Sequence, residues 1–261
     1  MVPFHAGSKV YPPHGTASRR PDFPLFSRRD KLYNRTVARL NDYGRFWRSG
    51  YTVRELALNG FRLLVWSRIV SALTHSFARR GAGVVIDCTA TVQGSRFIEI
   101  DDGTWAQRQV WLTVPLIELP EPPAGPVLKI GKRVQIGPRT TISAVREVVI
   151  EDDVLFGMNV YVSDHIHAFR DPRTPVKDQG LAAAGRVRIG AGAWIGANVV
   201  IVADGKDLEI GANAVIGANS VVTKSVPARG VAAGAPARVV DRWDEVSERW
   251  SSGREDAGPL D

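Results

Sequence analysis

Two of the chain's five histidines lie two positions apart, in the segment Asp164-His165-Ile166-His167. An unperturbed imidazole titrates at about pH 6.5, so it can accept a proton from a reacting group near neutral pH. The segment is a weak candidate for a metal site, because it supplies two ligands where a catalytic zinc ion usually takes three from the protein. A structural role, with both imidazoles bonded to backbone carbonyls, is the other alternative. The pattern favours proton transfer and predicts no metal ligands.

Basic residues suited to phosphate groups lie further along the chain. Lys224 belongs to the segment VTKSVP (222–227), and Arg238 ends the segment APAR (235–238). Ammonium and guanidinium groups pair well with phosphate oxygens, although a solvated surface side chain is the alternative for each. Cys88 is the one thiol that could carry an acyl group, but no histidine lies near it in the sequence. We therefore expect Cys88 to be structural and any acyl group to be transferred directly.

A six-residue repeat defines the elements that must position these residues. Large aliphatic residues return at every sixth position, and a glycine or a small or acidic residue often follows them. A second small or β-branched residue comes four places after the aliphatic one, as Val134 does after Ile130. The six series are Ile86, Val92 and Ile98; Ile100, Ala106 and Leu112; Ile130, Ile136 and Ile142; Ile150, Phe156 and Val162; Ile189, Ile195 and Ile201; and Ile210, Ile216 and Val222.

A period of six is neither helical nor a simple strand alternation. Three short strands joined by tight corners close one coil, and successive coils stack at the strand spacing of about 4.8 Å. The aliphatic residues then fill the interior, while glycine and asparagine suit corners with left-handed backbone angles. An ordinary parallel sheet covered by helices is excluded, because no segment of helical length separates the aliphatic runs. We therefore predict a mainly β fold, a left-handed parallel β-helix over residues 81–240.

The histidine pair lies where this repeat is interrupted. Between Val162 and Ile189 the aliphatic spacing lapses, and the inserted residues include His165 and His167. Loops that project from a rigid scaffold often carry binding and catalytic residues. The interruption therefore predicts a functional loop.

Residues 1–80 form a basic arm before the repeats. They hold 15 Lys/Arg and 4 Asp/Glu, whereas the remaining residues hold 19 and 23. We expect the start of the arm, rich in Pro, Arg and Ser, to be disordered. Thr52 and Glu55 form a capping box that predicts a helix over about 52–79, which would cover the open first coil. Residues 241–261 are expected to form a short helix, about 241–250, and a tail.

Composition is typical of a globular protein in a reducing compartment. Apolar residues make up 44% of the chain and charged residues 23%, and the single cysteine excludes an intramolecular disulfide. No signal peptide or membrane-spanning run is visible, so we expect a cytoplasmic protein. Peripheral contact with the inner face of the membrane, through an amphipathic N-terminal helix, is the alternative. The arm contains Arg45-Phe46-Trp47-Arg48 but no recognisable nucleic-acid-binding module, so no nucleic-acid partner is predicted.

Residues 130–240 resemble the hexapeptide-repeat acetyltransferases, especially sugar O-acetyltransferases of the surface-polysaccharide, maltose and galactoside type. The resemblance rests on IGKRVQIG (130–137), VSDHIHAFRDPRTPVKDQG (162–180), IGAGAWIGANVVI (189–201), IGANAVIGANSVVTKSVP (210–227) and AAGAPARVV (232–240). It implies that an acetyl group passes from acetyl-CoA to a hydroxyl of a sugar-like acceptor, such as a polysaccharide, a nucleotide-sugar or a lipid-linked sugar.

By this resemblance, His165 stands at the position of the family's general base. A hydroxyl hardly ionises at neutral pH, so its attack on a thioester benefits from a base that takes its proton. His167 is the second catalytic candidate, either orienting His165 or touching the acceptor. Asp164 and Arg139 are assigned to acceptor binding, and Arg139 stands where the family carries an asparagine.

The resemblance also implies a CoA site in a groove between neighbouring chains of a homotrimer. Ala197 and Ala218 match small residues whose backbone lines the pantetheine channel. Thr223 and Lys224 match a Thr-Lys pair after the final repeat, and Arg238 matches an arginine near the phosphates. Three alternatives remain: a serine O-acetyltransferase-like enzyme, a non-catalytic hexapeptide scaffold, and a metal-dependent hydratase on the same prism.

Overall fold

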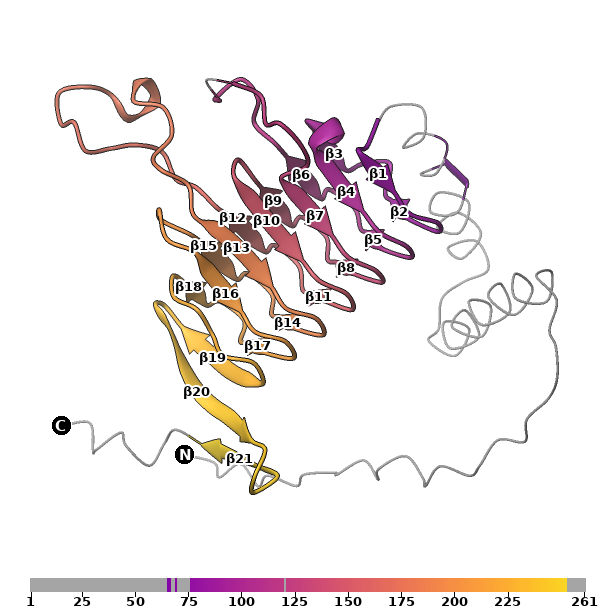
Figure 1. Ribbon diagram of the computed structural model, residues 1–261, viewed down its shortest axis with the longest axis vertical. Coiled ribbons are helices and arrows are strands. Elements are labelled where there is room, and N and C mark those ends of the chain that lie inside the picture. Colours follow the sequence, from indigo (N-terminus) through magenta and orange to yellow (C-terminus); the bar gives the residue numbers. More distant parts are fainter. Residues whose placement is uncertain (1–64, 67–68, 70–75, 120, 253–261) are drawn as a thin grey trace, which may run out of the picture. The chain divides into compact units, whose positions relative to one another are not determined.

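The protein is described by a computed structural model over residues 65–66, 69, 76–119 and 121–252 (Figure 1). From Arg79 onward these residues are mainly β-structure, arranged in three sheets. The chain visits sheets A, B and C in turn and then begins the next coil, and the strands of successive coils pair in parallel. These parallel sheets are consistent with the left-handed β-helix predicted from the repeat.

The strands are short, as a six-residue repeat requires. Sheet A contains β1 (Arg79–Arg80), β4 (Ile98–Ile100), β7 (Leu128–Ile130), β10 (Glu147–Ile150), β13 (Arg186–Ile189) and β16 (Leu208–Ile210). Sheet B contains β2 (Val85–Ile86), β5 (Trp105–Ala106), β8 (Gln135–Ile136), β11 (Leu155–Phe156), β14 (Trp194–Ile195), β17 (Val215–Ile216), β19 (Gly230–Gly234), β20 (Ala237–Asp244) and β21 (Arg249–Ser252). Sheet C contains β3 (Thr91–Gln93), β6 (Trp111–Thr113), β9 (Thr141–Ser143), β12 (Tyr161–Ser163), β15 (Val200–Val202) and β18 (Val221–Val222). Short 3-10 helices, η2 (Ser95–Phe97) and η3 (Val176–Asp178), lie in two of the connections.

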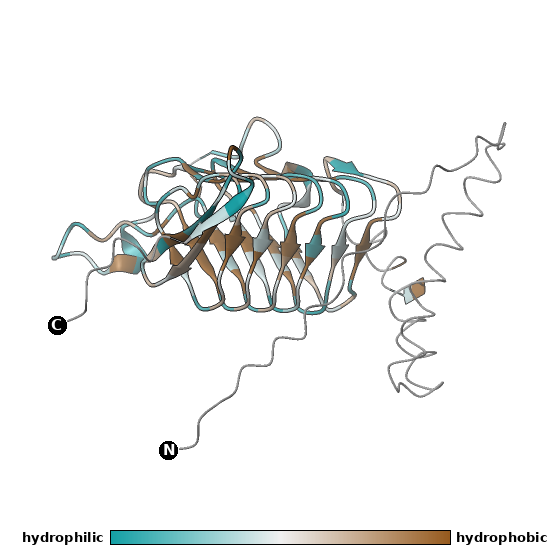
Figure 2. Cartoon of the chain, turned by 90° about the horizontal axis from the view of Figure 1, so that it is seen from below, coloured by the Kyte–Doolittle hydropathy of each residue, from teal (hydrophilic) through white to brown (hydrophobic). Residues whose placement is uncertain are grey.

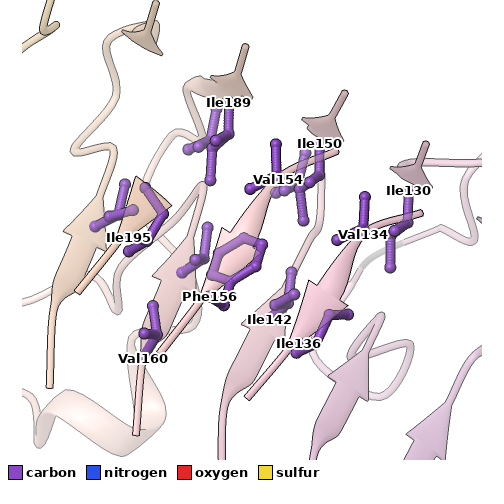
Figure 3. Packing of buried hydrophobic residues seen from close by; sticks show 14 of the residues in the cluster. Ile130, Val134, Ile136, Ile142, Ile150, Val154, Phe156, Val160, Ile189 and Ile195 are labelled. Carbon is purple, nitrogen blue, oxygen red and sulfur yellow. The ribbon is translucent and has the colours of Figure 1, made fainter. Parts of the chain in front are cut away.

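The aliphatic residues of the repeat stack in register from coil to coil. Along sheet A, Ile130 pairs with Ile150, Ile150 with Ile189 and Ile189 with Ile210. All four side chains are buried, and Figure 3 shows side chains of neighbouring coils pointing into one interior. Each buried isoleucine contributes about 1.5–3 kcal/mol to folding, so the stacked series supplies much of the driving force. The predicted apolar interior is confirmed.

Asparagines hold the corner between sheets B and C. Asn198 and Asn219 have φ values of 58° and 61°, in the left-handed region that asparagine tolerates better than most residues. The Asn159 side-chain N–H donates to Asn198 Oδ1 at 3.0 Å, and Asn198 donates to Asn219 Oδ1 at 3.0 Å. This ladder of amides links three successive coils at one corner.

Two long connections leave the edge between sheets C and A. Residues 114–127, of which 120 lies outside the described residues, join β6 to β7, and residues 164–185 join β12 to β13. Figure 1 shows both projecting from the same side of the coils, with the short turn 144–146 joining β9 to β10 between them. The second connection is the loop predicted from the interrupted repeat. The first was not identified from the sequence.

The C-terminal helix predicted over about 241–250 is wrong. β20 pairs antiparallel with β19, and β21 pairs antiparallel with β20, so sheet B continues past the last coil as a hairpin. Trp243 and Trp250 face each other across this hairpin, with ring centroids 5.6 Å apart and planes at 70°. The open edge of β19 offers backbone hydrogen bonds that a helix could not use, and the tryptophan pair adds a favourable cross-strand contact.

The N-terminal helix predicted over about 52–79 lies mostly outside the described residues. At its end the structure differs from the prediction, because Arg79–Arg80 form β1 and pair with β4. Phe77 packs against the hydrophobic core of the coils. The β-structure therefore begins slightly before the predicted boundary at residue 81. Within the described residues, no helix is long and apolar enough to cross a membrane.

Candidate active site

The connection over residues 164–185, called the His165 loop below, starts as two paired arms. The Ala182 N–H donates to the carbonyl of Ile166 at 2.9 Å, and the Ala168 N–H donates to that of Gly180 at 2.9 Å. His167 forms an antiparallel bridge with Leu181 between these bonds. The root of the loop is therefore hydrogen-bonded like a pair of strands, and it carries both histidines.

The tip of the His165 loop is cross-linked by two side chains. Gln179 Nε2 donates to the carbonyls of Asp171 at 2.8 Å and Thr174 at 2.6 Å. The Asp171 carboxylate accepts the Arg173 N–H and the Thr174 hydroxyl, both at 2.9 Å. These bonds, above all the one from the Arg173 backbone, lower the pKa of Asp171 below its usual value. The loop is thus internally braced although most of it faces solvent.

The Asp164 carboxylate is buried at the root of the loop, with a relative exposure of 0%. Its Oδ2 accepts the backbone N–H groups of Arg146 and Glu147, both at 2.8 Å. The Val145 N–H points between the two oxygens, 3.0 Å from Oδ1 and 3.1 Å from Oδ2. A buried carboxylate is costly unless its oxygens are hydrogen-bonded, so these three donors compensate for the burial of Asp164.

The fourth partner of Asp164 is His165. The Nδ1 atom of His165 lies 2.7 Å from Asp164 Oδ1, and the histidine is 8% exposed. With three N–H donors already directed at it, the carboxylate acts as the acceptor of this contact, so Nδ1 is the donor and Nε2 is left as the acceptor. Ser163 braces the same histidine, since its hydroxyl donates to the His165 carbonyl at 2.7 Å. This arrangement can accept a proton at Nε2 and stabilise the resulting charge at Nδ1.

The assignment of Asp164 to acceptor binding is corrected by this geometry. A fully buried carboxylate that already accepts four groups has no oxygen left to offer an acceptor, so its contact is with His165. The orienting contact predicted as one option for His167 also comes from Asp164. His167 itself is exposed, which leaves contact with the acceptor as its remaining predicted role.

Arg139 lies at the opposite edge of sheet C from the His165 loop, at the corner between sheets B and C. Its Nε donates to Asn159 Oδ1 at 2.7 Å, at the N-terminal end of the asparagine ladder. Its terminal nitrogen lies 3.7 Å from the sulfur of Met158. The described contacts of this side chain are therefore with the next coil, and a single chain does not place it in the His165 loop.

Ala197 and Ala218 lie at the same corner as Arg139, in later coils. The coils pack closely there: a Cβ added to Gly157 would lie 2.7 Å from the backbone nitrogen of Ala197, and one added to Gly196 would lie 2.7 Å from that of Ala218. Ala218 is exposed and Ala197 is half-buried. The corner therefore presents backbone and methyl groups, as a thin ligand needs for close approach.

The residues predicted near the phosphates lie at the C-terminal end of the coils. Thr223 and Lys224 follow β18 at the edge that also carries the His165 loop, and both are exposed. Arg238 is exposed on β20, opposite Ala233 of β19. One chain thus separates the predicted residues into the loop edge, the corner between sheets B and C, and the terminal hairpin.

Two other surface pockets among the described residues lie away from His165. One is lined by residues of sheet A that include Lys129, Glu151 and Asp152, and another lies at the terminal hairpin beside Arg229 and Trp243. Among the described residues, no three His, Cys, Asp or Glu side chains are grouped so that they could hold a metal ion.

Sequence reasoning missed Ser163 and the three backbone donors to Asp164. The contacts of Ser163 are local, but a serine at the end of a strand carries no signal of such a role. Residues 145–147 lie a full coil earlier, so only the stacking of coils brings their N–H groups to Asp164.

The comparisons with known proteins agree with this architecture. Residues 127–164 and 186–224 match the family model described as hexapeptide repeat of succinyl-transferase. The interval between the two matched stretches, residues 165–185, is the His165 loop without Asp164. An N-acyltransferase from Bacillus cereus, AntD, solved as a mutant with dTDP and coenzyme A, has the same fold, with a TM-score of 0.55. It is 19% identical, and the alignment covers 69% of this chain and 90% of that one.

Two proteins that are similar to this chain in sequence are named as acetyltransferases. A probable acetyltransferase of Mycobacterium tuberculosis is 35% identical over 113 residues, which is 43% of this chain and 36% of that protein. A putative lipopolysaccharide biosynthesis O-acetyl transferase of Escherichia coli is 29% identical over 130 residues, which is 48% of this chain and 65% of that protein. The chain therefore spans about a third of the length of the Mycobacterium tuberculosis relative and just under two thirds of the length of the Escherichia coli relative.

Proposed function

We propose that this chain, a hexapeptide-repeat protein with acetyltransferases among its relatives, moves an acetyl group from acetyl-CoA to a hydroxyl of a sugar-like acceptor. The observation that carries the proposal is the buried Asp164–His165 pair, at 2.7 Å, in the loop that interrupts the repeat. Candidate acceptors are a polysaccharide, a nucleotide-sugar or a lipid-linked sugar. The O-acetyl transferase name of the Escherichia coli relative supports a hydroxyl acceptor.

In this mechanism His165 is the general base. Its Nε2 takes the proton of the acceptor hydroxyl while the oxygen attacks the thioester carbonyl, so no free alkoxide has to form. The carbon–sulfur bond then breaks, and the imidazolium returns the proton to the departing CoA thiolate. Asp164 holds the imidazole in the required tautomer and stabilises its transient positive charge. Cys88 takes no part.

The proposed CoA site runs along the corner that presents Ala197 and Ala218. Pantetheine would lie against this line of small residues, and the phosphates would meet Arg238 on the hairpin beyond its C-terminal end. Lys224 lies at the edge that carries the His165 loop, so in this proposal it would reach the phosphates from the neighbouring chain. The exposure of both basic side chains supports this role. A cationic group beside a phosphate forms a charge-assisted hydrogen bond, which is stronger than a neutral one.

The active unit in this proposal is a homotrimer. Within one chain, sheet C separates His165 from the corner with Ala197 and Ala218, so a base and a channel at one site would come from two chains. Several outward residues of sheets B and C are also apolar, such as Trp194 of β14, which is 52% exposed, and Trp111 of β6, which is 43% exposed. Sheet A instead faces outward with Glu99, Lys129 and Arg188 among others. Figure 2 shows hydrophobic residues on the strands of successive coils, and these include the buried residues of the interior. Contiguous apolar faces of this kind favour burial against a partner.

A thiol-release assay with acetyl-CoA tests the proposal. Purified chain is supplied with sugars, nucleotide-sugars and serine, and free CoA is measured for wild type and His165→Ala. Release that requires a sugar-type acceptor and His165 supports the proposal. Release with serine alone would indicate a serine O-acetyltransferase, and a chain that neither binds nor consumes acetyl-CoA would be a scaffold.

A further inference from the structure

The corner between sheets B and C presents one residue from each of five successive coils in a single column. In each coil, the column residue is followed by a residue with a positive φ. The backbone N–H of that following residue donates to the carbonyl of the column residue in the preceding coil, at 2.9–3.1 Å. From the N-terminal to the C-terminal coil, the column consists of Arg108, Pro138, Met158, Ala197 and Ala218. Side-chain size therefore changes abruptly from alanine to methionine between Ala197 and Met158.

Met158 lies at the level of the catalytic histidine along the stack of coils. It belongs to the turn between β11 and β12, and His165 follows β12 within the same coil. Arg238, which is proposed to contact the phosphates, lies on the terminal hairpin beyond the coil of Ala218, at the other end of the column. If pantetheine follows Ala218 and Ala197, its sulfur end therefore points toward Met158.

The Met158 side chain is both exposed and held in place. It is 47% exposed, and its sulfur lies 3.7 Å from the terminal nitrogen of Arg139. The same guanidinium is fixed by its 2.7 Å bond to Asn159 Oδ1. The two alanines of the column are therefore followed by the longer side chain of Met158, and the movement of this side chain is limited by Arg139.

We propose that Met158 determines the length of acyl group that the enzyme accepts, and restricts it to acetyl. The inference rests on the proposed acyl transfer and extends it to donor specificity. Adjacent coils are about 4.8 Å apart, so a group attached to a thioester beyond Ala197 reaches the next coil after a few bonds. An acetyl group ends before the methionine. Further methylenes meet its side chain, whose displacement would break the contact with Arg139.

The test compares acetyl-CoA, propionyl-CoA and butyryl-CoA as donors to one accepted acceptor. Met158→Ala should raise the ratio of kcat/KM for butyryl-CoA to that for acetyl-CoA by about tenfold or more, in line with the cost of one misplaced methylene in an apolar pocket. Met158→Phe should move the ratio the opposite way. Val149→Ala removes an outward apolar group from sheet A in the same coil, and should leave the ratio unchanged.

An unchanged ratio in both Met158 variants, with acetyl transfer intact, would overturn this inference and leave the proposed function standing. A higher KM for the acceptor with an unchanged donor ratio would also overturn it, and would place Met158 against the acceptor instead. If wild type transfers no acyl group to any acceptor, the proposed function fails and this inference fails with it.

Discussion

Asp164 Oδ1 lies 2.7 Å from Nδ1 of His165, while the same carboxylate accepts three backbone N–H groups of residues 145–147. One buried side chain therefore joins the root of the His165 loop to the turn of the preceding coil. The rigid stack of coils positions the imidazole through this carboxylate, although the loop itself projects from the edge.

Replacing His165 by Ala or Asn should lower kcat by about 10²–10⁴-fold, the usual effect of losing a proton-transfer group. Acetyl-CoA affinity should change little and the fold should be kept, because the histidine lies outside the stacked core, although the buried Asp164 loses one partner. His167→Ala should have the smaller effect, since Asp164 already orients the base. Steady-state kinetics with all three variants measure this. Full activity in the double His165/His167 variant would exclude general-base catalysis by this loop.

Asp164→Asn should lower both stability and kcat. All the groups around the Asp164 carboxylate donate hydrogen bonds to it, whereas one end of an asparagine amide is itself a donor. At least one buried N–H group would therefore lose its acceptor, which costs about 1–3 kcal/mol of folding stability. The imidazole also loses the acceptor that fixes its tautomer. Thermal unfolding reports the first effect. A low-field proton resonance from the His165 Nδ1–H, present in wild type and absent in the variant, reports the second. Loss of stability with an unchanged kcat would leave Asp164 with a structural role alone.

The tip of the His165 loop should loosen in acid. Hydrogen bonds lower the folded-state pKa of Asp171, so its stabilising contribution is complete above its unfolded-state pKa of about 3.9. That contribution is lost as pH falls through the lower folded value. Amide exchange in residues 171–179, corrected for intrinsic rates, should therefore accelerate below about pH 4 in wild type. Asp171→Asn should exchange faster at neutral pH and show no such acid-dependent step. A step that persists in the variant would assign it to another group.

Much of this architecture could be predicted from the sequence, because the period of six specifies both strand length and the stacking of Ile130, Ile150 and Ile189. The errors arise where distant backbone decides the outcome. Residues 241–250 were predicted as a helix, but the free edge of β19 recruits them as strands. The assignment of Arg139 to acceptor binding stays a prediction, but its described side-chain contacts, Met158 and Asn159, lie one coil away and were not foreseen. Neither partner is adjacent in sequence, so residue type alone carried no signal of the contact.

Lys224→Ala and Arg238→Ala should raise the KM for acetyl-CoA more than they lower kcat. Phosphates lie far from the reacting carbonyl, so these contacts contribute equally to substrate and transition-state binding. Each loss should cost about 1–2 kcal/mol, as for a hydrogen bond to a charged group at an exposed position. Calorimetric titration with CoA separates binding from turnover. Equal CoA affinity in wild type and the double variant would remove both residues from the site.

The chain should sediment and scatter light as a homotrimer, with a mass near three times 28.5 kDa. Trp194→Arg places a charge on the exposed apolar face of sheet B, where burial against a second chain would leave it unpaired, so this variant should be monomeric at micromolar concentration. Val149→Arg adds the same charge to sheet A and should remain trimeric, which controls for general effects on folding. The monomeric variant should also lose acetyl transfer while keeping its β-structure by circular dichroism, because His165 and the Ala197–Ala218 corner would no longer meet. A monomer with full activity would show that one chain completes the site. The His165 loop would then have to reach across sheet C to the corner with Ala197 and Ala218.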